Sequence, residues 1–327
     1  MKFLFAGFRH PHIYTLLNIA ARAKNVTVSA CYEADVSARR AAERKTGIAF
    51  ADADYEQLLS GDIDAVAIGA RYGDRGGMIV RALKRGKHIL TDKPICTSIS
   101  QLDEIEGLAR EKGLTVGCMF DLRYLPSVVA AKKILQSGKL GEVRNVSFTG
   151  QHCLDYKNRP SWYFEKDMHG GTINDLAVHG IDLLNRLAGL GIKEVAAAKV
   201  WNAYAYRNKD FKDCALFMAR LTNGAGLLAD VSYSAPSSVF SLPTYWNFKF
   251  WCEKGLLTFN ATEKYARVYE DGKKRVKRFT AESEEDCISE FLKEISERRK
   301  VGTGKFTESV FSATRQCLEL QKIANGI

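Results

Sequence analysis

The sequence has no long hydrophobic run. No apolar stretch approaches the roughly 20 residues that a membrane-spanning helix needs. Near the amino terminus, polar Arg9 and His10 follow the first apolar residues too soon for the core of a signal peptide. We therefore expect a cytoplasmic protein with no membrane partner.

Closely spaced cysteine pairs are also missing. The eight cysteines are spread over the whole chain and form no Cys-x-x-Cys motif. Most of them lie in apolar segments, where reduced thiols behave as small hydrophobic side chains. The pattern is typical of a cytoplasmic protein and argues against both a disulfide framework and a zinc cluster.

The chain lacks a motif for reading nucleic acids, although 48 Lys and Arg against 38 Asp and Glu give it a net charge of +10. The densest basic segment, residues 273–278, follows Asp271-Gly272, a dipeptide typical of hairpin turns. We interpret this segment as the exposed face of a hairpin and expect no nucleic-acid partner. The surplus charge favours anionic small molecules instead.

What the sequence does contain, in its first 119 residues, is a regular alternation of strands and helices. Strands are expected at 2–6, 26–32, 63–69, 88–91 and 114–119, and helices at 12–24, 35–45, 76–85 and 100–112. This alternation predicts an α/β fold with a doubly wound parallel sheet, which binds ligands at the carboxyl ends of its strands. Since 327 residues suit two domains, we place the first at 1–121 and the second at 122–327.

The second half predicts a different sheet. Alternating apolar patterns at 143–149, 196–201, 215–221, 226–233, 245–251 and 256–260 indicate largely antiparallel strands, and helices are expected at 285–299 and 307–324. Trp246, Phe248 and Phe250 alternate on one face, which favours a buried face or a subunit interface over a base-stacking platform. An open sheet of this kind favours a homodimer or homotetramer.

The turn after the first strand reads Gly7-Phe8-Arg9-His10-Pro11-His12. A dinucleotide fingerprint has glycine at its first, third and sixth positions, whereas here only Gly7 remains and Arg9 and His12 replace the other two. The amino terminus of the following helix still attracts anions, and Arg9 adds a cation. We therefore assign Gly7, Phe8, Arg9, His10 and His12 to a cofactor-binding turn.

His10 and His12 have the spacing of a metal-binding pair, but the neighbouring sequence offers no obvious third and fourth ligand. We predict a loop-lining or helix-capping role and no metal site.

Glu33 ends the second strand, 26 residues after Gly7. An acidic residue there accepts the ribose hydroxyls of an adenosine and disfavours a 2′-phosphate, so we expect NAD(H) in preference to NADP(H). Because Arg39 and Arg40 follow closely, the sequence does not exclude NADP(H) as the cofactor.

Lys93 lies in Thr91-Asp92-Lys93-Pro94, directly after a predicted strand. Proline ends the strand, so that Lys93 projects from the carboxyl edge of the sheet. A lysine there can stabilise negative charge on a substrate oxygen. The alternative is an ordinary loop lysine.

Residues 170–182 form a second segment with several candidate catalytic residues. Two glycines precede a helix, and Thr172-x-x-Asp175 has the form of a capping-box variant. Asp175 and His179 are four residues apart and therefore share a helix face, on which a carboxylate can orient an imidazole for general acid–base work. Asp182 is on the same face, where it either supports this pair without touching the substrate or is simply an exposed charge. The alternative is a capping aspartate and a helix histidine without function.

The order of these motifs, from the glycine turn through Asp92-Lys93-Pro94 to Asp175 and His179, resembles that of the Gfo/Idh/MocA oxidoreductases along essentially the whole chain. Glucose–fructose oxidoreductase and inositol dehydrogenase typify that family. The resemblance implies an amino-terminal Rossmann domain, a carboxyl-terminal α/β domain with an open antiparallel sheet, and hydride exchange between a nicotinamide and a sugar, polyol or cyclitol. It implies a catalytic or substrate-orienting role for Lys93 and proton transfer by His179. Asp175 would contact the substrate or orient the imidazole.

The resemblance also completes the candidate site. It places Ala70, Arg71, Asp92 and Lys93 at the cofactor, and it suggests a substrate pocket lined by Lys93, Asp175, His179, Arg123, Tyr124, Arg159 and Trp162. The chain departs from the family at Asp92, where glutamate is usual, and at Arg75, where a histidine often stands. We expect Arg9, Arg71, Arg75 and Lys93 to lie near an anionic cofactor or a developing oxyanion. The alternative function is a binding or regulatory protein of the same fold with weakened cofactor binding.

Overall fold

A computed structural model describes residues 1–297 and 300–326, and the chain divides into two compact units. The first unit comprises Met1–Phe120, Lys166–Gly170 and Asp286–Thr314, and the second comprises Asp121–Glu165, Gly171–Glu285 and the chain from Arg315 onward. Neither unit is one continuous stretch. The domains 1–121 and 122–327 stay a prediction from the sequence.

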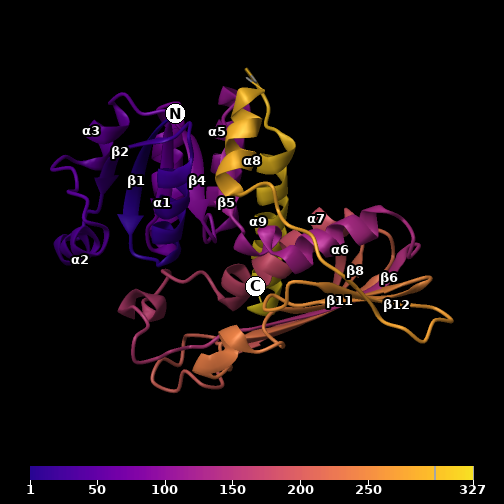
Figure 1. Cartoon of the computed structure of the whole chain (residues 1–327). Coiled ribbons are helices and arrows are strands. Elements are labelled where there is room, and N and C mark those ends of the chain that lie inside the picture. Colours follow the sequence, from indigo (N-terminus) through magenta and orange to yellow (C-terminus); the bar gives the residue numbers. More distant parts are fainter. Residues whose placement is uncertain (298–299, 327) are drawn as a thin grey trace. The chain divides into compact units, whose positions relative to one another are not determined.

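The first unit is built on a parallel sheet of five strands (Figure 1). Its strands are β1 (Lys2–Phe8), β2 (Thr27–Tyr32), β3 (Ala65–Gly69), β4 (His88–Asp92) and β5 (Val116–Met119), in the order β2-β1-β3-β4-β5. Every residue of β3 is buried, as expected of a strand in a sheet that is covered on both faces. The predicted doubly wound parallel sheet is confirmed.

Helices connect these strands in the predicted alternation. They are α1 (His12–Arg22), α2 (Val36–Thr46), α3 (Tyr55–Leu59), α4 (Tyr72–Lys84) and α5 (Ile99–Lys112), and α8 (Cys287–Ser296) belongs to the same unit. Helix α4 begins four residues before its predicted start at 76, and its second residue, Gly73, packs where a Cβ would lie 2.5 Å from the Asp167 carbonyl oxygen. Helix α3 is too short for a periodic signal and depends on the capping box of Asp54 and Gln57.

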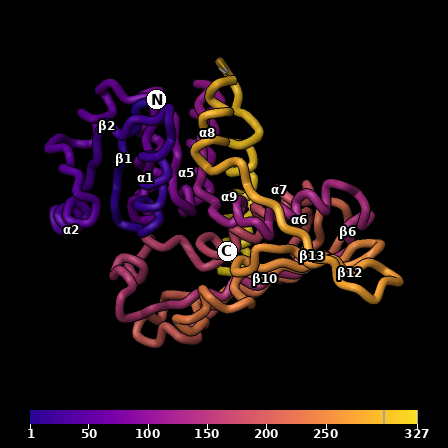
Figure 2. The backbone as a smooth tube through the Cα atoms, in the orientation of Figure 1, coloured from indigo at the N-terminus to yellow at the C-terminus, as the bar shows by residue number. Residues whose placement is uncertain are grey.

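The second unit contains an eight-stranded sheet in the order β13-β12-β11-β10-β6-β9-β8-β7. The strands are β6 (Val143–Gln151), β7 (Ile192–Trp201), β8 (Cys214–Leu221), β9 (Gly226–Ser232), β10 (Asn247–Cys252), β11 (Gly255–Phe259), β12 (Ala266–Glu270) and β13 (Lys277–Phe279). All neighbouring pairs are antiparallel except β6 and β9, which confirms the largely antiparallel prediction. The predicted hairpin is β12–β13, whose turn contains Gly272 at φ +68° (Figure 2).

The two faces of this sheet differ. Helices α6 (Pro126–Gln136) and α7 (Val178–Ala188) lie on one face (Figure 1), where Phe248 and Phe250 are buried as predicted. The alternate side chains point the other way and are exposed. We call this surface the outer face; it carries Leu216, Met218, Leu228, Trp251 and Tyr269.

The remaining helical segments are short, apart from the last helix. They are the 3₁₀ helices η1 (Asp121–Tyr124), η2 (Ser161–Phe164) and η4 (Ser237–Ser241), the π-helix η3 (Ile173–Ala177) and the long helix α9 (Lys305–Ala324). Among the described residues, no helix is both long enough and apolar enough for a bilayer crossing. All eight cysteines are free thiols and seven are buried, as predicted.

Candidate functional site

The turn after β1 is packed tightly against the end of β3. Gly7 has φ +76°, and a Cβ on it would lie 2.7 Å from the backbone of Ala70, so the position requires glycine. The backbone N–H groups of Arg9 and His10 both donate to the Gly69 carbonyl oxygen at 3.1 Å. The turn therefore meets the carboxyl ends of two neighbouring strands, where the sequence predicts the cofactor.

Glu33 lies beside this turn. Its carboxylate is almost fully buried and accepts hydrogen bonds from the N–H groups of Phe8 at 2.6 Å and Asp35 at 2.9 Å. Arg9 lies 4.0 Å from Glu33 and 3.5 Å from Asp35. The Ala38 N–H group lowers the pKa of Asp35, and the charges of Arg9 and Arg71 lower it further. Both guanidinium groups therefore approach this edge of the sheet.

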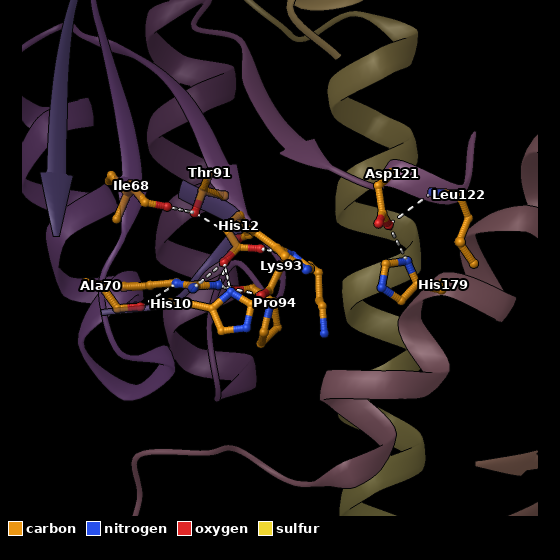
Figure 3. Close-up of polar contacts among 12 residues, drawn as sticks. His10, His12, Ile68, Ala70, Thr91, Lys93, Pro94, Asp121, Leu122 and His179 are labelled. Atoms are coloured by element: carbon orange, nitrogen blue, oxygen red, sulfur yellow. Dashed lines mark hydrogen bonds and ion pairs between the residues drawn. The ribbon is translucent and has the colours of Figure 1, made fainter. Parts of the chain in front are cut away.

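Asp92, at the end of β4, is the centre of a cluster that we call the Asp92 cluster, in which His10 and Arg75 are buried and His12 is partly exposed (His10 and His12 are labelled in Figure 3). Nδ1 of His10 contacts one carboxylate oxygen, and Nδ1 of His12 lies 3.0 Å from the other. Arg75 Nη2 donates to Asp92 Oδ2 at 2.8 Å. Since an ionised carboxylate only accepts hydrogen bonds, both Nδ1 atoms act as donors.

Charge and burial oppose each other in this cluster. Burial would raise the pKa of Asp92, but the neighbouring His10, Arg75 and His12 outweigh it and hold the pKa well below its usual range. Burial lowers the pKa of His10 to about 4, against the attraction of Asp92. At neutral pH the cluster therefore contains an anionic Asp92 and a neutral His10.

In the Asp92 cluster, a carboxylate joins the two histidines as a third possible metal ligand, which the sequence next to the histidines does not contain. His10, His12 and Asp92 each offer one ligand atom, and these atoms all lie within 4.8 Å of one another. Two imidazoles and a carboxylate can hold a metal ion such as Zn²⁺. Arg75 already pairs with the same carboxylate, and its positive charge opposes a second cation there. That the pair of histidines holds no metal stays a prediction.

Arg75 also binds the main chain. Its Nη1 donates to the carbonyl oxygens of Asp92 at 3.0 Å, Lys93 at 2.5 Å and Pro94 at 3.0 Å, and its Nε donates to Ala70 at 2.8 Å. The guanidinium is fully buried. Arg75 is therefore held by groups of the protein interior, and its predicted place near an anionic ligand stays a prediction.

The other predicted residues of the first unit lie near the same strand ends. Lys93 follows β4 and is 5% exposed. Arg71 precedes α4, is partly exposed, and donates to Asp74 at 2.6 Å. The interior position of Asp92 leaves it in contact with protein groups, and its predicted role at the cofactor stays a prediction.

In the second unit, Asp175 and His179 stand on either side of a change in helix type. Asp175 lies in the π-helix η3 and His179 in the first turn of α7. Such π turns are frequent at functional sites. The predicted capping box is wrong: Thr172 has helical φ and ψ of −68° and −33°, and its hydroxyl donates to the Lys212 carbonyl oxygen.

Each of these two side chains has a neighbour that the sequence reasoning missed. The Tyr233 hydroxyl donates to Asp175, and burial together with the charge of Asp175 raises the pKa of Tyr233 well above its usual value. His179 Nδ1 lies 3.7 Å from Asp121 Oδ1 (Figure 3), and its ring meets Trp246 edge-on with centroids 5.2 Å apart. That Asp175 orients His179 stays a prediction.

The residues predicted to line the substrate pocket are mostly interior. Arg123 forms a buried two-point ion pair with Asp182, with Nε at 2.8 Å from Oδ2. This pairing excludes the exposed-charge interpretation of Asp182. Trp162 is 1% exposed, and its ring is tilted by 35° against that of Tyr163 with the centroids 4.2 Å apart.

Arg159 and Tyr124, the two remaining candidates, are only partly buried. Arg159 donates to the carbonyl oxygens of Cys153 and Leu154 at 2.5 and 2.8 Å. The Arg186 guanidinium lies 5.9 Å from the centre of the Tyr124 ring.

His169 is a further buried histidine that the sequence reasoning did not select. Its segment binds α4 through a hydrogen bond from the Gly73 N–H group to the Met168 carbonyl oxygen at 2.9 Å. The His169 ring lies 5.8 Å from that of Tyr72, which lies 5.4 Å from that of His10. His169 directly precedes the glycine pair at the start of residues 170–182, and this position was the sequence signal that could have identified it.

Comparison with protein families matches both halves of the chain. Residues 3–120 match the model described as "Oxidoreductase family, NAD-binding Rossmann fold", and residues 128–258 match the GFO/IDH/MocA C-terminal domain.

Curated relatives match in part. Levoglucosan dehydrogenase of Pseudarthrobacter phenanthrenivorans is 28% identical over 163 residues, which cover 48% of this chain and 41% of the relative. The dTDP-3,4-didehydro-2,6-dideoxy-alpha-D-glucose 3-reductase of Actinomadura kijaniata is 30% identical over 144 residues, which cover 44% and 43%. The chain thus spans less than half the length of these two relatives.

Solved structures match over the whole chain. A structure from Erwinia carotovora atroseptica has a TM-score of 0.87 at 22% identity and 99% coverage of both chains. The aldose-aldose oxidoreductase of Caulobacter crescentus has a TM-score of 0.80 at 14% identity, with 100% of this chain and 98% of that one covered. A 3-ketoreductase of Actinomadura kijaniata, in complex with NADP and TDP-benzene, has a TM-score of 0.79 at 17% identity, with 99% and 97% covered. These likenesses establish the fold.

Proposed function

Since the chain belongs to the Gfo/Idh/MocA family of oxidoreductases, we propose that it transfers hydride between a nicotinamide cofactor and a hydroxyl or carbonyl of a sugar, polyol, cyclitol or derivative. The observation that carries this proposal is the placement of Lys93 at the carboxyl end of β4, in the same unit as the turn after β1. Ligands of parallel α/β sheets bind at this edge. The relatives named above, a sugar dehydrogenase and a sugar reductase, support the substrate class.

The residues beside the turn suit a dinucleotide. The amino terminus of α1 and the cations of Arg9 and Arg71 favour a pyrophosphate, and the close packing of Gly7 sets the turn at the sheet edge. In our proposal His10, His12, Phe8, Ala70 and Lys93 complete the wall of this site, and Asp92 acts from behind it. The nicotinamide, when bound, accepts or donates the hydride.

NAD(H) is the cofactor that we propose over NADP(H). The Glu33 carboxylate, held by two backbone N–H groups, is placed to accept ribose hydroxyls and to repel a 2′-phosphate. Arg39 is drawn to acidic neighbours, with Nη1 at 3.3 Å from Asp52 and Nε at 3.5 Å from Glu43. These contacts reduce its availability for a phosphate.

The chemical step needs a proton acceptor and a group that steadies the substrate oxygen. In the oxidation direction we assign the hydroxyl proton to an imidazole nitrogen of His179, while the Lys93 ammonium donates a hydrogen bond to the oxygen as the C–H hydride departs. Asp175, held by Tyr233, is the carboxylate that we assign to the substrate or to the imidazole. Tyr124 is our candidate for the pocket surface, and Arg123 and Trp162 support it from the interior.

We also propose a cytoplasmic homodimer or homotetramer. The free, mostly buried thiols suit a reducing compartment. The exposed apolar side chains of the outer face suit a subunit interface, because monomeric proteins rarely leave such a surface in water.

A binding or regulatory protein of the same fold is the second candidate. It is favoured by the side chains of Arg9 and His12, which occupy glycine positions of the dinucleotide fingerprint.

Two measurements test the proposed function. Calorimetric titration with NAD, NADH, NADP and NADPH should detect binding, with the tightest values for NAD(H). With a sugar or polyol substrate, Lys93→Met should lower kcat by a factor on the order of 10² to 10³. The control is Lys84→Met on α4, whose side chain is 58% exposed and which should leave kcat unchanged. Full activity in Lys93→Met excludes the assigned role, and absence of nucleotide binding favours the second candidate.

A further inference from the structure

Arg75 holds the main chain on both sides of Lys93. Its Nη1 donates to the carbonyl oxygen of Asp92, in the peptide before Lys93, and to that of Lys93, in the peptide after it. The two peptide planes on either side of a residue determine its φ and ψ. One guanidinium that binds both carbonyls therefore determines the direction in which the Lys93 side chain leaves the backbone.

We propose that Arg75 is a positioning residue for Lys93 and that Arg75 and Asp92 act as one unit in that role. The inference rests on the proposed function in one respect, which is that Lys93 takes part in hydride transfer. It gives Arg75 a role in which it acts through Lys93 and does not touch the substrate.

The Asp92 carboxylate makes this arrangement possible. Arg75 and Asp92 are both fully buried, and a buried guanidinium is stable only with a counterion and satisfied donors. The ion pair at 2.8 Å supplies the counterion, and Nη1 and Nε donate to four backbone carbonyl oxygens. Removing Asp92 would leave the guanidinium buried without its counterion, and removing Arg75 would leave the carboxylate with the two imidazoles as donors.

The two departures from the family that the sequence shows separately meet in this pair. Asp92 is one methylene shorter than the usual glutamate, and Arg75 is longer than the histidine that often stands in its place. In the structure the longer cation reaches the shorter carboxylate. The two positions are therefore in direct contact in this chain, so that exchanging both residues tests whether they are coupled.

The same carboxylate connects Lys93 with the turn after β1. His10 and His12 bind the two oxygens of Asp92 from that turn. The Thr91 hydroxyl donates to the carbonyl oxygen of Asp92 at 2.9 Å, which adds a further restraint on the backbone before Lys93. The direction of Lys93 and the conformation of the turn are thus set by one group of hydrogen bonds.

Arg75→Lys separates positioning from charge pairing. A lysine keeps a cation for Asp92, but its single ammonium has three donors and lacks the planar fork that reaches Ala70, Asp92 and the carbonyls around Lys93. We expect kcat to fall by a factor on the order of 10 to 10², with the dissociation constant of NAD within about twofold of the wild type. Arg81→Lys, on an exposed position of the same helix, is the matched control and should leave both values unchanged.

The exchange of both residues tests whether they act as a unit. Asp92→Glu alone should lower kcat, because the longer side chain must fit a filled interior, and Arg75→His alone should lower it because the fork is lost. The double variant R75H/D92E should recover at least about tenfold over the poorer single variant, as coupled residues do. If the effects of the two single variants on kcat simply add in the double variant, the proposal that Arg75 and Asp92 act as a unit is wrong.

Crystal structures of the wild type and Arg75→Lys give a readout that does not depend on turnover. We expect the Lys93 backbone and Nζ to be displaced in the variant, and to return in R75H/D92E. A Lys93 that keeps its place in Arg75→Lys overturns the inference, whatever the kinetics. If the wild type transfers no hydride with any sugar or polyol, the proposed function fails, while these structures still decide whether Arg75 positions Lys93.

Discussion

Asp92 is contacted by three side chains, although its carboxylate is fully buried. The cost of burying this charge is offset because Arg75 pairs with it and two imidazoles donate to it. The sequence shows Asp92 only as a neighbour of Lys93, without these partners. At the scale of single residues, the environment of Asp92 therefore depends on which charged and polar side chains are buried together with it.

His10 predicts a loss of stability in mild acid. Burial lowers its pKa to about 4, whereas an unfolded histidine titrates near about 6.5. As the pH falls below about 6.5, the unfolded chain therefore binds a proton that the folded chain refuses until about pH 4. We expect the free energy of unfolding to decrease over this window by an amount on the order of 3 kcal/mol from this residue.

Denaturant unfolding at a series of pH values measures this effect. His10→Gln cannot titrate, so its stability should fall less than that of the wild type between about pH 6.5 and pH 4. Asp92 contributes a separate loss at lower pH, because its folded pKa is depressed and its stabilisation disappears only as the pH falls below about 4. Equal slopes for the wild type and His10→Gln in the upper window would contradict the prediction.

Two helices show that residues typical of N-caps do not always act as caps. Helix α2 has Asp35 as a conventional N-cap that accepts from the Ala38 N–H group. The helix around Asp175 has no such cap, because Thr172 is already helical and η3 takes the π form. Capping patterns predict helix starts well only where the residue before the helix is extended.

The turn after β1 gives a prediction at the scale of an element. Gly7→Ala would place a Cβ 2.7 Å from the Ala70 backbone in a left-handed conformation, so the turn must shift. We expect the affinity for NAD to fall by a factor of about 10 or more, and the free energy of unfolding to fall by about 1 to 3 kcal/mol. Thermal unfolding and calorimetric titration measure the two effects.

Gly77→Ala is the matched control for this turn. Gly77 lies in α4 with ordinary helical backbone, and a Cβ added to it would meet nothing within 4 Å outside its own helix. Alanine there should leave NAD binding unchanged and stabilise the protein by up to about 1 kcal/mol. If Gly7→Ala behaved like Gly77→Ala, the close packing of the turn would have no role in binding.

The outer face matters at the scale of the whole molecule. Met218 and Leu228 stand opposite each other on β8 and β9 and are 49% and 52% exposed. Trp251 on β10 is 50% exposed on the same face. An exposed apolar surface on a β-sheet is a liability unless another surface covers it.

A charge on this face should break the proposed oligomer. Leu228→Lys and Met218→Lys each place an ammonium where a subunit interface would exclude water, so we expect light scattering to report a smaller species than for the wild type. Thermal stability of the separated chain should change by no more than about 0.5 kcal/mol, as at other surface positions. Val276→Lys in the β12–β13 hairpin is the control and should leave the molecular mass unchanged. A wild type that is already monomeric would refute the oligomer.

The sequence by itself determined the alternation of strands and helices in the first unit, the parallel sheet, the largely antiparallel second sheet, and the position of Lys93 after β4. These follow from periodicity and chain order, which act over a few residues. Only the tertiary structure decided the partners of the charged groups: Asp175 meets Tyr233 across 58 positions, and Arg123 meets Asp182 across 59. Arg75 is the clearest case, because a surplus cation in the sequence becomes a buried one that binds Asp92 and the backbone around Lys93. Pairing between charged groups depends on packing between distant segments, which local patterns do not show.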